Sequence, residues 1–219
     1  CGISRRRLIA GTAAAAAISQ VSAESLSIAS AGREAVVYQT TSLTAEGLVA
    51  ALRSVQSTFK GRIAVKLHTG EPHGPNILPR EWVKALINEL PDAVIVETNT
   101  LYGGPRAAAS RHRETLVTNG WTFAPVDILD EEGGTPWPIA SGSRLKSVTV
   151  GSHLDRYDSM LVLTHFKGHG MAGFGGSLKN ISIGCASGKL GKQQIHQLPG
   201  DGTWPGGPLF MERMVEGGK

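Results

Sequence analysis

Cysteine is almost absent from this sequence, whose 219 residues include only Cys1 and Cys185. Two cysteines cannot form a disulfide framework, a four-cysteine zinc site or a self-contained ferredoxin cluster. Aromatic residues (5%) and charged residues (18%) are also few, whereas hydrophobic residues make up 41% of the chain. This balance excludes a highly charged disordered chain, and the length is that of one domain or slightly more.

Long apolar runs and a strong charge of one sign are missing too. No apolar run in the body of the chain approaches the roughly 18 residues of a membrane span. The net charge of +4 is too small to indicate a nucleic-acid partner by itself. We therefore expect no nucleic-acid partner and no transmembrane span in the mature part, and the sequence leaves the oligomeric state open.

Residues 4–23 have the pattern of an export signal. They begin with a serine and three arginines, continue with a mildly apolar Ala-rich stretch and end in small residues. The pair Arg5-Arg6 resembles the twin-arginine signal, which implies export machinery of that type and a periplasmic or extracytoplasmic location. The alternative is an amphipathic helix that stays attached. The expected organisation is a signal peptide at 1–23, a linker at 24–34 and an α/β domain at 35–219 that is incomplete at its C-terminus.

Strand-like and helix-like segments alternate along the rest of the chain. Such alternation indicates βαβ units and a mostly parallel sheet flanked by helices, an α/β fold. The expected strands are 35–39, 62–68, 93–98, 125–129, 147–150 and 159–166, and the expected helices are 44–59, 80–90 and 107–119.

Three of the expected strands end in pairs of polar residues, and a glycine-rich loop follows each, at 69–76, 100–105 and 168–176. Residues two apart share one face of a strand. Ligands of open α/β sheets bind outside the carboxyl ends of the strands, so we expect one crevice if these strands are neighbours. For any single strand, the alternative is that the pair marks where the strand emerges into water. The pairs are Lys66 with His68, Glu97 with Asn99, and His165 with Lys167.

The loop 168–176 is rich in glycine, with five glycines in nine positions. Its free N–H groups can form an anion nest, and we expect Gly173, Gly175 and Gly176 to contact a ligand. The stretch between Asp158 and Asp201 contains no acidic residue but four lysines. A small anionic ligand, such as a carboxylate, a phosphate or an anionic cofactor, is the natural occupant. The four lysines are Lys167, Lys179, Lys189 and Lys192.

Two nucleotide-binding patterns are disfavoured in this loop. The glycines at 168, 170 and 173 match the spacing of the dinucleotide fingerprint, but position 193 is Gln where a confirming acid would stand. The phosphate-binding pattern that ends in Gly-Lys fails because Gly176, not a lysine, follows Gly175.

Histidines near the expected crevice are candidates for metal binding and for acid–base catalysis. Imidazole groups, a thiolate and a carboxylate could together bind zinc, nickel or iron. The candidate metal ligands are His68, His165, His169 and Cys185; alternatively, the histidines are hydrogen-bonding loop residues and the cysteine is simply buried. The candidate catalytic residues are His165 and His169 as general bases and Lys66 as a clamp for a carboxylate.

Three segments resemble the domain-of-unknown-function family 362: KLHTGEPHGPN at 66–76, ETNTLYGG at 97–104 and HFKGHGMAGFGGSLKNISIGCAS at 165–187. The resemblance extends over roughly 35–218. That family is commonly described as uncharacterised iron–sulfur-centre proteins, often with cysteine-rich cluster motifs toward the C-terminus. The resemblance implies an iron–sulfur cluster or another transition metal, with a redox role, and a natural chain that continues beyond Lys219.

The run GFGGSLK at 173–179 is similar to the Gly-Phe-x-Gly-Gly-x-Lys run of the nickel-dependent lactate racemase family. In that family a lysine tethers a nickel-pincer cofactor, and by this match Lys179 would be the tether. The continuation at 180–184 differs from the Pro-Gly expected there. The first hypothesis is thus an exported metal- or iron–sulfur-associated protein with a crevice for an anion. The alternatives are a racemase- or isomerase-like enzyme on a small carboxylic acid and a non-catalytic periplasmic anion-binding protein.

Overall fold

The computed structural model describes residues 4–7, 36–196 and 207–219, and the chain divides into two units at residues 1–56 and 57–219. In the first unit, β1 (Ser4–Arg7) pairs antiparallel with β2 (Val36–Gln39). Helix α1 (Ala45–Arg53) follows, and its N-terminus is capped by the Thr44 hydroxyl, which accepts from the backbone N–H of Gly47. The predicted linker, and the predicted signal peptide apart from β1, lie outside the described residues.

The second unit is built on a four-stranded sheet in which all strands are parallel. The order is β5 (Val126–Ile128), β4 (Ala93–Glu97), β3 (Ile63–Lys66) and β8 (Ser159–Val162). Every residue of β3 and β4 is buried, as expected for central strands covered on both faces. The α/β fold with a mostly parallel sheet is confirmed, and the three strands with polar ends are neighbours.

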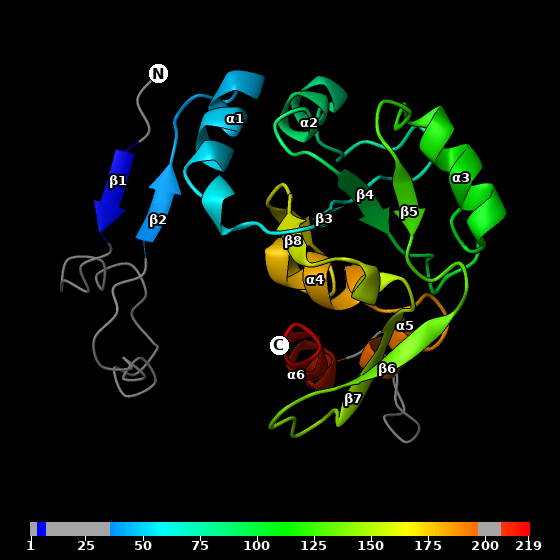
Figure 1. Ribbon diagram of the computed structural model, residues 1–219. Helices are drawn as coiled ribbons and strands as arrows, with labels where there is room; N and C mark the ends of the chain where they lie inside the picture. The colour runs from blue at the N-terminus through cyan, green and yellow to red at the C-terminus, as the bar shows by residue number, and fades with distance from the viewer. Residues whose placement is uncertain (1–3, 8–35, 197–206) are drawn as a thin grey trace. The chain divides into compact units, whose positions relative to one another are not determined.

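Helices cover both sides of this sheet (Figure 1). Helices α2 (Arg80–Ile87) and α3 (Ala109–Thr118) lie on one side. Helix α4 (Ser177–Cys185) packs on β3 and β8 from the other side, with α5 (Gly191–His196) and α6 (Gly207–Glu216) against it. The core on this side joins Ala64, Val94 and Val96 of the sheet to Ile183 of α4 and Phe210 of α6.

Several predicted boundaries are corrected. The strand predicted at 159–166 ends at Val162, because its neighbour β3 ends at the paired residue Lys66. The helix predicted at 44–59 ends at Arg53, and Gln56–Thr58 forms a short 3-10 helix instead. The loop 168–176 contains a hairpin of β9 (Lys167–His169) and β10 (Gly173–Gly175).

The strand at 134–138 was not predicted either. Strand β6 (Gly134–Pro138) contains two prolines and is exposed along its length, and it pairs antiparallel with β7 (Ser147–Gly151). Proline is tolerated in a strand at an edge, where its missing N–H is not needed. In the described part of the chain, no helix combines the length and apolar character that a membrane crossing requires.

Candidate functional site

A cavity of about 350 Å³ lies at the carboxyl ends of β3 and β4, between the loops that follow these strands, the β9–β10 hairpin and α4. Its position is the one expected for a ligand site in an open parallel sheet. The residues predicted from the sequence that line it are Lys66, His68, Glu97, His165, Lys167, His169, Gly175, Gly176 and Lys179.

Three of the predicted residues do not line this cavity. Asn99 is buried beneath it, and Gly173 lies in β10 at the positive φ of 67° that glycine favours. Cys185 is buried beside a second cavity of about 500 Å³, which is lined by Val150, Met160 and other mostly apolar side chains. Burial raises the pKa of the Cys185 thiol. The sulfur therefore belongs to an apolar region and not to the histidine-lined cavity.

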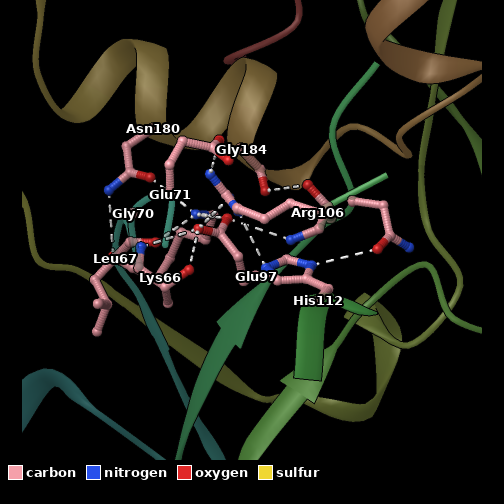
Figure 2. A network of polar contacts seen from close by, with 12 residues as sticks. Lys66, Leu67, Gly70, Glu71, Glu97, Arg106, His112, Asn180 and Gly184 are labelled. Atoms are coloured by element: carbon pink, nitrogen blue, oxygen red, sulfur yellow. Dashed lines mark hydrogen bonds and ion pairs between the residues drawn. The ribbon is translucent and has the colours of Figure 1, made fainter. Parts of the chain in front are cut away.

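Lys66 is the last residue of β3, and its ammonium group is fully buried under α4 (Figure 2). Nζ donates hydrogen bonds to Glu97 Oε1 (2.8 Å), to the Leu67 carbonyl (2.8 Å) and to Asn180 Oδ1 (2.9 Å). These acceptors use all three N–H groups of an ammonium. The helix comes this close because position 184 is Gly: a Cβ there would lie 2.7 Å from Lys66 Cε.

Glu97, the last residue of β4, forms ion pairs with two cationic side chains. Its Oε1 accepts from Lys66, and its Oε2 accepts from Arg106 Nη2 (3.0 Å) and from the Thr69 backbone N–H (3.1 Å). Burial alone would raise the pKa of Glu97, but the charges of Lys66 and Arg106 hold it well below its usual range. The side chain is therefore a permanent carboxylate, the counter-ion of the two cations and not a free proton acceptor.

Arg106 connects this ion pair to α3. Its Nη1 contacts Glu71 Oε1 (3.2 Å), and its Nε donates to His112 Nε2 (3.2 Å). Because a guanidinium can only donate, the ring proton of His112 is assigned to Nδ1, which donates to Asn99 Oδ1 (3.3 Å). Asn99 Nδ2 then donates to Asp130 Oδ1 (3.1 Å). Burial is the largest cause that lowers the pKa of His112 to about 4; the attraction of Glu97 opposes it in part, and the charge of Arg106 adds a smaller lowering effect.

Lys192 of α5 holds the residues after β4 against the turn between α4 and α5. Its buried Nζ donates to Thr98 Oγ1 (2.5 Å), to the Asn99 carbonyl (2.6 Å) and to the Ala186 carbonyl (2.8 Å). All three acceptors are uncharged, and burial lowers the pKa of Lys192 to about 7. This lysine also lines the cavity, on its α5 side.

The side chains that the β9–β10 hairpin, the residues before it and α4 contribute to the cavity make few hydrogen bonds or ion pairs with the described residues. Among the described residues, Lys167 Nζ donates one hydrogen bond, to the Asn76 carbonyl at 3.5 Å. His169 Nδ1 accepts from the backbone N–H groups of Met171 (3.3 Å) and Ala172 (3.2 Å), which leaves its ring proton on Nε2. His165 Nε2 is buried and has no hydrogen-bond partner in the part of the chain that the structure describes. Burial lowers the pKa values of His165, His169, Lys167 and Lys179, and neighbouring lysines lower all but that of Lys167 further.

His68, on the loop after β3, is also neutral at ordinary pH. Burial lowers its pKa to about 3, and the attraction of Glu97 opposes this only in part. Across 4–7, 36–196 and 207–219, no group of three or more His, Cys, Asp or Glu side chains is placed to hold a metal ion. The described donors therefore do not fit a metal centre, and an iron–sulfur cluster or other metal stays a prediction from the family resemblance.

Sequence reasoning missed several residues that build this site. Arg106 and Glu71 form an ion pair, and the Tyr102 hydroxyl donates to Glu71 Oε1 (2.9 Å). All three lie in or beside the glycine-rich loops, and this position was the one feature of the sequence that could have indicated them. Loop residues have no periodicity from which the direction of a side chain can be predicted. For Lys192, one feature of the sequence could have indicated a place in the site: its position in the stretch without acidic residues. His112 had no such signal, since it lies on α3 and reaches the site through its hydrogen bonds with Arg106 and Asn99.

An all-parallel sheet with a polar cavity at the carboxyl ends of its strands defines an α/β protein with a concave site at the usual edge. A protein-family model described as "Domain of unknown function (DUF362)" matches residues 63–217, which is most of the chain. The chain belongs to the DUF362 family, as the three resembling segments predicted. A comparison with curated protein sequences gives no match. The likeness to the lactate racemase family stays a prediction.

Proposed function

We propose that this protein binds a small anionic ligand, a carboxylate or a phosphate, in the cavity at the carboxyl ends of β3 and β4. The observation that carries the proposal is the charge of the lining. The lining holds two acidic residues, Glu71 and Glu97, against five lysine or arginine side chains. A cavity lined by an excess of basic side chains attracts anions. The five basic side chains are Lys66, Arg106, Lys167, Lys179 and Lys192.

The ligand's negative group is expected near Lys167 and Lys179. Lys66 and Arg106 are already paired with Glu97, and Lys192 is held by three uncharged oxygens. Neither Lys167 nor Lys179 contacts a carboxylate among the described residues, so an incoming anion would supply the missing charge. The volume of about 350 Å³ is near the lower end for ligand pockets, which favours a small molecule.

Ligand titration tests this proposal directly. The melting temperature of the full chain should rise with the concentration of inorganic phosphate or of small carboxylates. The Lys179→Ala and Lys167→Ala variants should weaken binding by about tenfold or more each, which corresponds to about 1.4 kcal/mol. Lys189→Ala is the matched control, because Lys189 lies in the same acid-free stretch but is exposed. Equal affinities in all four proteins would contradict an anion site in this cavity.

Association with an iron–sulfur cluster or another metal, with a redox role in an exported protein, is a finer proposal supported by family membership. Metal analysis and visible absorption of the full chain, purified without oxygen, test it. A colourless, metal-free protein that is stable and still binds anions would contradict the metal and leave the anion site standing.

A second candidate function is racemase- or isomerase-like proton transfer on a small carboxylic acid, and the unpartnered Nε2 of His165 favours it. Burial lowers the pKa of this imidazole, so it is neutral near pH 7 and can accept a proton from the carbon beside a bound carboxylate. Deuterium exchange at that carbon should appear in heavy water and disappear in the His165→Gln variant. Binding without exchange would indicate the non-catalytic anion-binding protein.

A further inference from the structure

We propose that Lys179 is a nucleophilic amine that forms an imine with an anionic carbonyl compound, of the 2-oxo acid class, bound in the cavity. This inference rests on the proposed anion site and adds the class of ligand and a covalent step. It is carried by a comparison of the lysines that line the cavity.

The bonding of Lys179 differs from that of the other lining lysines. Lys66 and Lys192 each donate three hydrogen bonds and are held as structural cations. Lys167 donates one long hydrogen bond within the described residues, to the Asn76 carbonyl. Within the part of the chain that the structure describes, Lys179 makes neither a hydrogen bond nor an ion pair, although it is half-buried in the cavity wall. An amine that no protein acceptor engages has its lone pair available once it loses a proton.

The surroundings of Lys179 make the loss of a proton from its ammonium group easier. Burial is the largest cause that lowers its pKa, and the nearby charges of Lys167 and Lys66 act in the same direction more strongly than Glu97 opposes them. A lysine that is desolvated and next to another cation is activated as a nucleophile toward carbonyl groups. Since the residue is the third of α4, the positive end of the helix dipole adds to the same effect.

The rest of the cavity suits the two other parts of a 2-oxo acid. Lys167 lacks a carboxylate partner among the described residues and can hold the carboxylate of the ligand. His165 Nε2 has no hydrogen-bond partner among the described residues, and in the tautomer that carries the ring proton on Nε2 it can donate to the oxygen of the carbonyl group. An anion with a hydroxyl or phosphate group could also bind to Lys167 and His165. It has no carbonyl carbon, however, with which the amine of Lys179 could react.

The step balances without an oxidant or reductant. The lone pair of Nζ attacks the carbonyl carbon, the C–N bond forms, and the oxygen takes up a proton to give a carbinolamine. The C–O bond then breaks, and the oxygen leaves as water with the second proton from nitrogen. One amine and one carbonyl group thus give one imine and one water.

Reductive trapping tests the imine in the full chain. Pyruvate or glyoxylate with cyanoborohydride should attach the reduced ligand to the protein, and peptide mass mapping should place it on Lys179. Lactate has a carboxylate but no carbonyl group, so it should bind, compete with pyruvate and leave no adduct. The Lys179→Arg variant keeps the charge and should lose the adduct, whereas Lys189→Arg should trap as well as the unaltered protein.

The outcomes separate this inference from the proposed function. An adduct that persists in Lys179→Arg, or that spreads evenly over exposed lysines, would overturn the role of Lys179. Binding of pyruvate without any trapped adduct would overturn the imine but leave the anion site intact. Failure of pyruvate, glyoxylate, lactate and phosphate to bind would overturn both. Thermal unfolding of each variant shows whether a negative result comes from misfolding.

Discussion

At the scale of single residues, Glu97 sets the charge balance of the site. It is the shared counter-ion of Lys66 and Arg106, and the side chains of all three are nearly inaccessible to solvent. Removing one partner of a buried ion pair is more damaging than replacing the whole pair, because the charge left behind has lost both water and its counter-ion. The alternation of side chains along the strand predicted that Glu97 lies at the site, but it did not predict that the residue would be neutralised from two sides.

The Glu97→Gln variant should therefore be strongly destabilised. The amide keeps the size of the side chain but leaves two buried cations with one carboxylate fewer, and we expect a loss of about 3–5 kcal/mol in the free energy of unfolding. Urea unfolding of the variant and of the unaltered protein measures this loss of stability. The exposed Glu114 on α3 provides the control, since Glu114→Gln should change stability by about 0.5 kcal/mol or less. Similar small effects in both variants would show that the network is not a source of stability.

His112 predicts how stability depends on pH. Its pKa is about 4 in the folded protein against the ordinary 6.5, so between these values the unfolded chain binds more protons. Stability from this residue is complete above about pH 6.5 and is lost as pH falls through 4, by about 3 kcal/mol. The lowered pKa of His68 acts in the same direction. Urea unfolding from pH 8 to 4.5 should show this decline, in a range above the ordinary pKa of glutamate. The decline should be smaller in the His112→Gln variant, and an unchanged slope would contradict the assignment.

At the scale of elements, the strand ends were more predictable than the helix that covers them. The polar pairs after β3, β4 and β8 are visible in the sequence, because buried strands read as apolar runs that stop at the sheet edge. No helix was expected at 177–185, where Gly184 and the β-branched Ile181 and Ile183 have low helix propensity. Packing of α4 on β3 and β8 outweighs that propensity.

Gly184 is the residue through which α4 and β3 meet, and Gly184→Ala should weaken that contact. A Cβ at this position would lie 2.7 Å from Lys66 Cε and 2.9 Å from its Nζ, and Lys66 has no free space because it is fully buried. We expect a loss of about 1–3 kcal/mol in the free energy of unfolding, as for overpacked cores. A Cβ at Gly103 would meet no atom within 4 Å, so Gly103→Ala is the control and should be close to neutral. Equal stabilities of the two variants would contradict the close approach.

At the scale of the whole molecule, the fold class was predictable and the pairing of loops was not. Alternating strands and helices indicate an α/β sheet in any strand order, but only the order β5-β4-β3-β8 brings the three polar ends together. Contacts such as those of Arg106 with Glu71 and of Lys192 with Thr98 join segments that are far apart in sequence. Nothing in either segment alone indicates its partner.

The second unit should contain the whole anion site. All residues that line the cavity lie between Lys66 and His196, and the family match begins at residue 63. A protein that begins at Ser57 should therefore unfold cooperatively and bind phosphate or small carboxylates with the affinity of the full chain. Calorimetric titration of both proteins measures this. A loss of affinity in a shorter protein that still unfolds cooperatively would show that the first unit contributes to the site.

Some basic side chains of the cavity are paired with a carboxylate and others are not, and this difference affects the rate at which a ligand associates. The charges of Lys66 and Arg106 are compensated by Glu97 and Glu71, whereas Lys167 and Lys179 meet no carboxylate among the described residues. The attraction that an approaching anion feels therefore comes mainly from the hairpin and from the start of α4. Raising the ionic strength from 0.1 M to 1 M shortens the screening length from about 10 Å to about 3 Å. The association rate of the ligand should fall accordingly, while its dissociation rate, set by contacts inside the cavity, should change little.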